Sequence, residues 1–123
     1  MIPDIALPRE FTAPLCRFEV QRQVYPCAFG KNGVTSQKKE GDGATPIGSF
    51  HVRSVYYRAD RIAKTRLKTS LPLHPITPSD GWCDDVQSKF YNKPIKLPFQ
   101  GSYQNLWQND HVYDVIVVIG YND

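Results

Sequence analysis

The alternation of apolar and polar residues predicts a chain of short β-strands separated by turns. Residues 15–20 alternate with a period of two, which is typical of a strand with one buried face. Residues 23–29 form a second candidate strand, and the Asn-Gly pair in residues 30–33 predicts a hairpin-like turn before a return strand at residues 34–35. The clearest strand of the first half lies at residues 47–57, where β-branched and aromatic residues are frequent.

The second half is less regular, apart from one apolar run. Residues 59–70 are ambiguous, and the prolines of residues 71–78 predict an irregular or edge-like segment. Residues 79–101 predict a long loop, and residues 103–110 predict one or two helical turns with Ser102 as a candidate N-cap. The β-branched run at residues 113–120 predicts a strand buried on both faces. Because a buried strand normally leads into further structure, we expect the domain to be incomplete at its C-terminus.

A turn precedes the strand at residues 47–57. Gly41 and Gly43 bracket Asp42, and glycine accepts positive φ without a steric cost. Pro46 directs Thr45 towards an extended conformation. A phosphate-binding loop would need a helix after the glycines and a lysine at its end, whereas here the lysines come first and a β-prone run follows. The pattern favours a shaped turn over a nucleotide site.

The composition is that of one globular domain. The chain has 123 residues, 41% of them hydrophobic and 22% charged, and its formal charge of +3 is mild. The basic residues of segment 58–68 carry no recognised nucleic-acid motif, so we interpret them as a mostly solvated face. The N-terminus lacks the pattern of a secretory signal, and the apolar run at residues 115–119 is too short to cross a bilayer.

The three cysteines are too widely spaced for a zinc ribbon or a dithiol redox site. Only Cys83 lies in a plausible functional loop, where His74 or His111 could serve as its base. The alternative is a packed thiol beside Trp82, the usual role of a lone cysteine. The other two cysteines of the chain are Cys16 and Cys27.

Carboxylates gather in the same loop. Asp80, Asp84 and Asp85 offer oxygen ligands for a hard cation, but the closing glutamate of a calcium loop does not follow. We therefore expect no metal site, and no pattern points to a cofactor.

Four stretches together resemble one family. Residues 39–50, with the sequence KEGDGATPIGSF, resemble the signature of the L,D-transpeptidase catalytic domain of the YkuD type. Three further stretches, one before and two after this signature, look like the same branch of the family and occur in the family's order. They are residues 27–33, 81–85 and 113–122. The resemblance implies a mostly β fold, a sandwich or barrel with few short helices. It also implies enzymes in which a cysteine attacks a tetrapeptide stem of peptidoglycan, forms an acyl-enzyme and cross-links a second stem.

The resemblance is incomplete where the chemistry should be. The family places its nucleophile in a Ser/Thr-x-Gly-Cys stretch, preceded by a histidine and C-terminal to the strand matched here by residues 115–119. We therefore expect both residues after Asp123, no catalytic residue in this chain, and no activity from the chain alone. Residues 14–123 would be the N-terminal portion of the domain, and residues 1–13 an extended lead-in.

The resemblance also suggests partners and a location. By family position, the substrate groove would be lined by Trp82, Asp84, Tyr91 and Asn92. The expected partners are peptidoglycan stem peptides and a missing C-terminal segment or a swapped chain, without nucleic acid, and the expected location is the cell envelope. Two alternatives remain: a non-catalytic β domain that binds cell-wall glycan or peptide, and an unrelated cysteine hydrolase that uses Cys83.

Overall fold

The computed structural model describes residue 28 and residues 30–121 in full, together with the backbone of four strands nearer the N-terminus. These are β1 (Ile5–Ala6), β2 (Glu10–Ala13), β3 (Phe18–Val20) and β4 (Gln23–Tyr25). The other elements are β5 (Val34–Thr35), β6 (Thr45–Pro46), β7 (Gly48–Tyr57), the 3-10 turn η1 (Lys64–Arg66), β8 (Leu67–Lys68), β9 (Leu73–Pro75), β10 (Asp80–Cys83), β11 (Pro94–Lys96), β12 (Tyr103–Asn105) and β13 (Val115–Ile119). The predicted mostly β architecture with little helix is confirmed.

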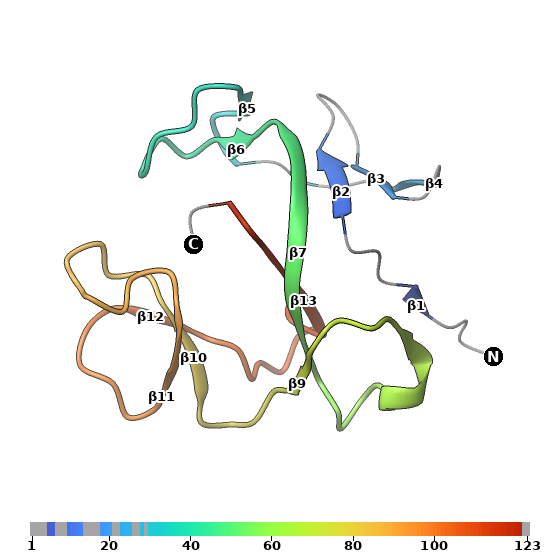
Figure 1. Ribbon diagram of the computed structural model, residues 1–123. Coiled ribbons are helices and arrows are strands. Elements are labelled where there is room, and N and C mark those ends of the chain that lie inside the picture. The colour runs from blue at the N-terminus through green and yellow to red at the C-terminus, as the bar shows by residue number, and fades with distance from the viewer. Residues whose placement is uncertain are drawn as a thin grey trace.

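The long strand β7 organises the largest sheet, which has the order β13-β7-β2-β3-β4 (Figure 1). Strand β13 runs antiparallel along one side of β7, and β2 and the short parallel strand β9 share the other side. The strand predicted at residues 47–57 is therefore confirmed, as is the edge-like character of residues 71–78. Strands β3 and β4 confirm parts of the two earlier predictions. Residue 28, within the second prediction, lies in no strand, and the other residues of both predictions lie outside the described part.

Three smaller sheets complete the described chain. Strands β11, β10 and β12 form an antiparallel sheet, and β1 pairs with β8 in parallel. Strand β5 pairs in parallel with β6, so the return strand expected after the Asn-Gly turn does not close a hairpin with β4. The segment expected to be a lead-in, residues 1–13, contributes β1 and β2, and β2 belongs to the largest sheet.

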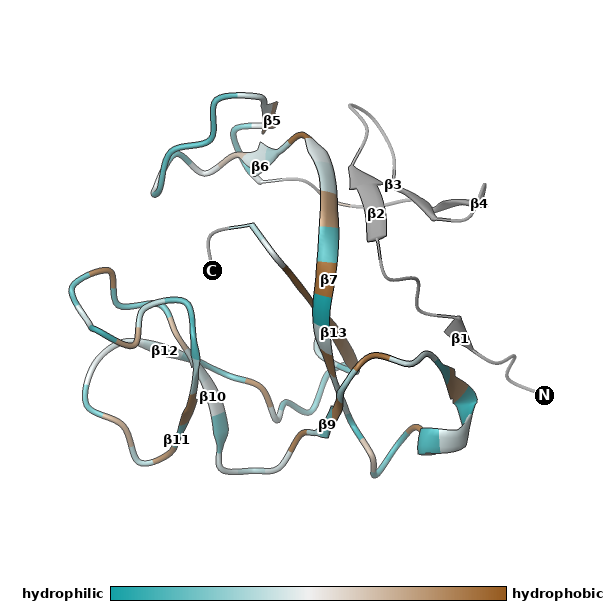
Figure 2. Ribbon diagram, viewed as in Figure 1, coloured by the Kyte–Doolittle hydropathy of each residue, from teal (hydrophilic) through white to brown (hydrophobic). Residues whose placement is uncertain are grey.

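The core lies where β7 meets its neighbours. Along β7 the side chains alternate between solvent and interior on each side of a shift between Val52 and Val55, where the register with β13 also shifts. Teal and brown bands along the strand mark its hydrophilic and hydrophobic residues (Figure 2). Val52, Val55 and Leu71 are buried together, and Leu73 and Val115 pack against them. Val55 is completely buried and pairs in register with Val117 of β13. The C-terminal half of β7 therefore attaches β13 to the core.

Three predictions about the second half are wrong. The long loop predicted at residues 79–101 contains β10 and β11, which pair with Asp80 opposite Lys96. The helical turns predicted at residues 103–110, with Ser102 as N-cap, are replaced by β12 and bends. Strand β13 is not buried on both faces: within the described residues it is an edge strand, and Val117 is 37% exposed.

Two arginines of the basic segment support the bends before β13. Arg58 is only 4% exposed and donates to both carboxylate oxygens of Asp60 at 2.8 Å. Arg61 donates to a carboxylate oxygen of Asp114 at 2.6 Å and to main-chain carbonyls of the same segment. The interpretation of residues 58–68 as a solvated face is therefore wrong at these two positions.

Candidate functional site

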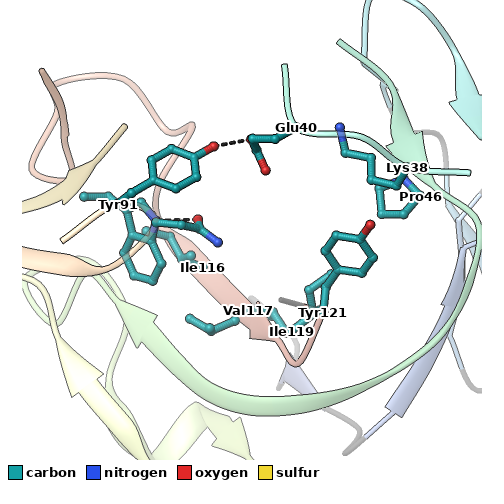
Figure 3. Close-up of a pocket in the computed structure, with 11 residues that line it drawn as sticks. Lys38, Glu40, Pro46, Tyr91, Ile116, Val117, Ile119 and Tyr121 are labelled. Carbon is teal, nitrogen blue, oxygen red and sulfur yellow. Dashed lines mark hydrogen bonds between the residues drawn. The ribbon is translucent and has the colours of Figure 1, made fainter. Parts of the chain in front are cut away.

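A cavity of about 320 Å³ lies beside β13. Tyr91 and Glu40 meet on one side of it and Tyr121 lies on another, with side chains of β13 between them (Figure 3). Three separate parts of the chain contribute to its wall: the turn that precedes β7, the end of β10 with the loop that follows it, and the C-terminal strand. The lining residues are Lys38, Glu40, Pro46, Trp82, Tyr91, Asn92, Ile116, Val117, Val118, Ile119 and Tyr121.

The carboxylate of Asp42 holds the turn that carries Lys38 and Glu40. It accepts hydrogen bonds from the Lys38 ammonium and, at 2.9 Å each, from the N–H groups of Lys39 and Ala44. These bonds, with that from Lys38 the strongest, lower the pKa of Asp42 to about 2. Gly41 and Gly43 adopt φ of 79° and 66°, so the predicted need for glycine on both sides of Asp42 is confirmed.

Trp82 and Asn92 form the second part of the wall. The indole Nε1–H of Trp82 donates to Oδ1 of Asn92 at 3.0 Å. Asn92 has φ of 58°, a left-handed conformation that asparagine tolerates better than most residues, and its N–H donates to the carbonyl of Cys83 at 2.9 Å. The indole and the amide thus fix each other's orientation at the cavity.

Tyr91 joins the loop after β10 to the turn before β7. Its hydroxyl donates to the carboxylate of Glu40, a residue 51 positions earlier in the chain (Figure 3). This hydrogen bond, with some desolvation, raises the pKa of Tyr91 to about 12. The contact closes one side of the cavity and connects two turns, whose flanking strands belong to different sheets.

Asp84, the fourth expected substrate residue, does not line this cavity. Its carboxylate accepts a hydrogen bond from Nε2 of Gln104 at 3.0 Å. Hydrogen bonds from Ser102 and Gln104 lower the pKa of Asp84. The structure therefore brings Trp82, Tyr91 and Asn92 together and assigns Asp84 to a contact between β12 and the end of β10.

Cys83 is a buried thiol. Its residue is 0% exposed, and Sγ lies 4.0 Å from the carbonyl oxygen of Asp85 rather than beside an imidazole. His74 stacks on Tyr56, and Nδ1 of His111 lies 2.8 Å from the Asp114 carboxylate. Neither suggested Cys–His pair forms. The side chains of Cys16 and Cys27 lie outside the described residues.

The loop carboxylates have separate partners. Asp80 binds the ammonium of Lys96 and accepts the N–H of Thr77 at 2.7 Å, whereas Asp84 binds Gln104. Across residue 28 and residues 30–121, His, Cys, Asp and Glu form no group of three that could hold a metal ion. The same part of the chain has no helix that is both long and apolar enough to cross a membrane.

The other lining residues were not identified from the sequence as site residues. Lys38 and Glu40 belong to the glycine-rich turn, which was interpreted as a turn and, from residue 39 on, as part of the family signature, but not as part of the substrate groove. Ile116, Val117 and Ile119 belong to a run whose hydrophobicity indicated a buried strand. A signal for the site lay in the same run: residues 115–119 contain no polar residue, and an apolar strand that is not fully covered can line a cavity.

Comparison with protein families identifies a match over most of the chain. The model of the YkuD family, described as the L,D-transpeptidase catalytic domain, matches residues 5–116. No curated protein and no solved structure matches the chain. The match covers most of the 123 residues and includes the turn before β7, the loop after β10 and the beginning of β13. The chain therefore belongs to the YkuD family of L,D-transpeptidase catalytic domains.

Proposed function

We propose that the cavity beside β13 binds a peptide stem of peptidoglycan, and that the chain forms the substrate-binding part of an L,D-transpeptidase of the cell envelope. The proposal rests mainly on the convergence of Trp82, Tyr91 and Asn92 on this cavity. These residues were expected at the substrate groove from the family resemblance alone. Their meeting with an exposed strand edge makes the cavity a suitable receptor for an extended peptide.

The wall of the cavity suits such a ligand. Strand β13 is the edge of the described sheet, and an extended peptide can add to such an edge through main-chain hydrogen bonds. Trp82 and Tyr91 offer apolar ring surface, while Lys38 and Glu40 place one charge of each sign on the lining. A stem that carries both ammonium and carboxylate groups would find complementary charges there.

None of the described residues supplies the nucleophile in the proposed enzyme. In the proposed reaction a cysteine thiolate attacks the carbonyl of the L,D peptide bond, and the terminal D-alanine leaves with a proton as the acyl-enzyme forms. An amine of a second stem then attacks the thioester, which returns the thiol. The Ser/Thr-x-Gly-Cys stretch that would supply this cysteine does not occur in the sequence. The burial of Cys83 supports this assignment, because a nucleophile must reach its substrate.

Binding can be tested with a tetrapeptide stem that ends in D-alanine. In a Trp107→Phe background Trp82 is the remaining tryptophan, and its fluorescence should change saturably with added peptide. Asn92→Ala should weaken binding by about tenfold, because it removes a polar contact and the partner of the indole. Asn105→Ala is the matched control, since Asn105 is an exposed asparagine outside the cavity lining. Absence of saturable binding, or equal weakening by both variants, would contradict the proposal.

Catalysis needs a separate measurement. The chain alone should release no D-alanine from the tetrapeptide, and Cys83→Ala should leave this result unchanged. Release that Cys83→Ala abolishes would overturn the assignment of the nucleophile to another segment.

A non-catalytic cell-wall-binding domain is the second candidate, favoured by the lack of a Cys–His contact at Cys83. Sequencing the gene beyond codon 123 separates the candidates: a histidine followed by Gly-Cys in an open frame supports the enzyme.

A further inference from the structure

A second cavity, of about 400 Å³, lies between β7, β9 and the β10–β11 hairpin. Its lining includes Tyr56, His74, Asp80 and Lys96, together with two prolines and Ile95. None of these residues lines the cavity beside β13. The volume is in the range of small-molecule sites, and the lining combines ring surface with a few polar groups, as such sites do.

Aromatic rings that contact one another connect the two cavities. The ring of Tyr56 lies 4.8 Å from that of His74, with a tilt of 33°. Tyr56 also makes an edge-to-face contact with Trp82, with ring centroids 6.0 Å apart. Trp82 lines the first cavity, and Ile116, another residue of that cavity, is the register partner of Tyr56 on β13. A ligand in the second cavity would therefore lie next to one in the first.

The polar side of the second cavity is balanced in charge. Asp80 binds the ammonium of Lys96, and its other oxygen accepts both the N–H and the hydroxyl of Thr77. The Lys96 side chain is 71% exposed, and an ammonium group has three N–H donors, of which Asp80 uses one. Burial and the Asp80 carboxylate raise the pKa of Tyr56, so its hydroxyl stays protonated. The cavity thus offers neutral and paired hydrogen-bonding groups rather than a net charge.

We propose that the second cavity binds an amino-sugar ring of the peptidoglycan glycan strand, beside the stem peptide in the first cavity. The inference rests on the proposed function. A pyranose ring has C–H groups that pack against aromatic rings, and hydroxyl and acetamide groups that both donate and accept hydrogen bonds. The Tyr56–His74 wall meets the first need, and the Asp80–Lys96 pair meets the second. A strongly charged ligand would suit the balanced pair less well.

The probe is the trisaccharide triacetylchitotriose, titrated into the full chain by calorimetry. His74→Ala and Lys96→Gln should each weaken its binding by about tenfold or more. Lys93→Gln is the matched control, because Lys93 is an exposed lysine of the same hairpin that lines neither cavity. Thermal melts show whether each variant remains folded. His74 is exposed at an edge strand, so His74→Ala should fold even where Lys96→Gln does not.

The tetrapeptide, titrated in parallel, separates this inference from the proposed function. Both ligands should bind together, and the two sugar-site variants should leave peptide affinity within about twofold. Failure of the trisaccharide to bind, equal binding to His74→Ala, or competition with the tetrapeptide would overturn the sugar site. Peptide binding without sugar binding would leave the proposed function intact. Sugar binding that requires His74, without peptide binding, would support this site and contradict the proposed function.

Discussion

The guanidinium carbon of Arg58 lies 3.7 Å from the centroid of the Trp107 ring. Nη1 of the same arginine donates to the carbonyl of Gln108 at 2.6 Å, and its Nε and Nη2 bind the carboxylate of Asp60. Arg58 directly follows β7, and Trp107 lies in the bends between β12 and β13. A planar cation thus fixes the approach of β13 to the sheet, and with it one wall of the candidate site.

Arg58→Lys should lower the midpoint of thermal unfolding, although it conserves the charge. Lysine cannot make the two-pronged contact with Asp60 and also contact Gln108 and the Trp107 ring. Lys64→Gln, which removes a charge from the exposed 3-10 turn, is the control and should change the midpoint little. Equal midpoints for Arg58→Lys and the unsubstituted chain, measured by circular dichroism, would show that the planar contacts contribute no stability.

Gly30→Ala should destabilise the turn before β7 more than Gly41→Ala. A Cβ on Gly30 would clash with the carbonyl of Gly43, whose carbon would be only 2.9 Å away, and backbone cannot rotate aside. At Gly41 the added Cβ meets nothing within 4 Å, so only the strain of φ 79° remains. We expect about 3 kcal/mol for the first substitution and about 1 kcal/mol for the second, measured by urea unfolding. The reverse order would contradict the close approach of the two segments.

Ionised Asp42 should make the free energy of unfolding decrease at acidic pH. Its pKa falls from 3.8 to about 2 on folding, so its contribution is complete above pH 3.8 and is lost as the pH falls through about 2. Asp42→Asn should therefore be less stable than the unsubstituted chain at neutral pH, and the difference should shrink between these two values. Urea unfolding at a series of pH values measures it, and a difference that does not vary with pH would refute the ionic origin.

Tyr91→Phe should open the cavity beside β13. The substitution removes the hydroxyl that binds Glu40 and leaves the ring, so acrylamide should quench Trp82 more strongly in a Trp107→Phe background. Tyr103→Phe is the control, because Tyr103 contacts Phe99 through its ring and lies outside the lining. Since the pKa of Tyr91 rises from 10 to about 12 on folding, the stabilisation by this contact is complete below pH 10 and is lost as the pH rises through about 12. Unchanged quenching in Tyr91→Phe would show that the contact does not shield Trp82.

Cys83 should react slowly with iodoacetamide in the folded chain. A residue that is 0% exposed reacts only when the structure opens, so we expect labelling about a hundredfold slower than in urea-unfolded protein. Mass spectrometry of the separate peptides distinguishes Cys83 from Cys16 and Cys27. Fast labelling of native Cys83 that persists at acidic pH would revive the hydrolase interpretation.

Much of the β architecture could be predicted from local signals. Strand β7 and the run at β13 are rich in β-branched residues, and the glycines around Asp42 specify positive φ. The two strands and the turn can therefore be recognised without knowledge of distant contacts. The hairpin of β10 and β11 escaped prediction because its strands are short and contain Gly81 and Pro94, which are typical of loops. Asp80 and Lys96 resemble loop residues until the ladder places them opposite each other.

The candidate site was likewise predicted in part from the sequence and determined in part by tertiary contacts. The resemblance carried by the four stretches was enough to name Trp82, Tyr91 and Asn92 as site residues, although it also named Asp84, which lies outside the cavity lining. Their meeting with Glu40 and β13 depends on contacts between residues far apart in the chain, such as the 51 positions between Glu40 and Tyr91. Burial likewise follows from packing: Arg58 lies inside and Val117 is partly exposed, although hydrophobicity predicts the opposite for both. Periodicity and turn chemistry can specify elements, but only the folded sheet determines which side chains share an interior, because free energy of burial depends on neighbours that the local sequence does not contain.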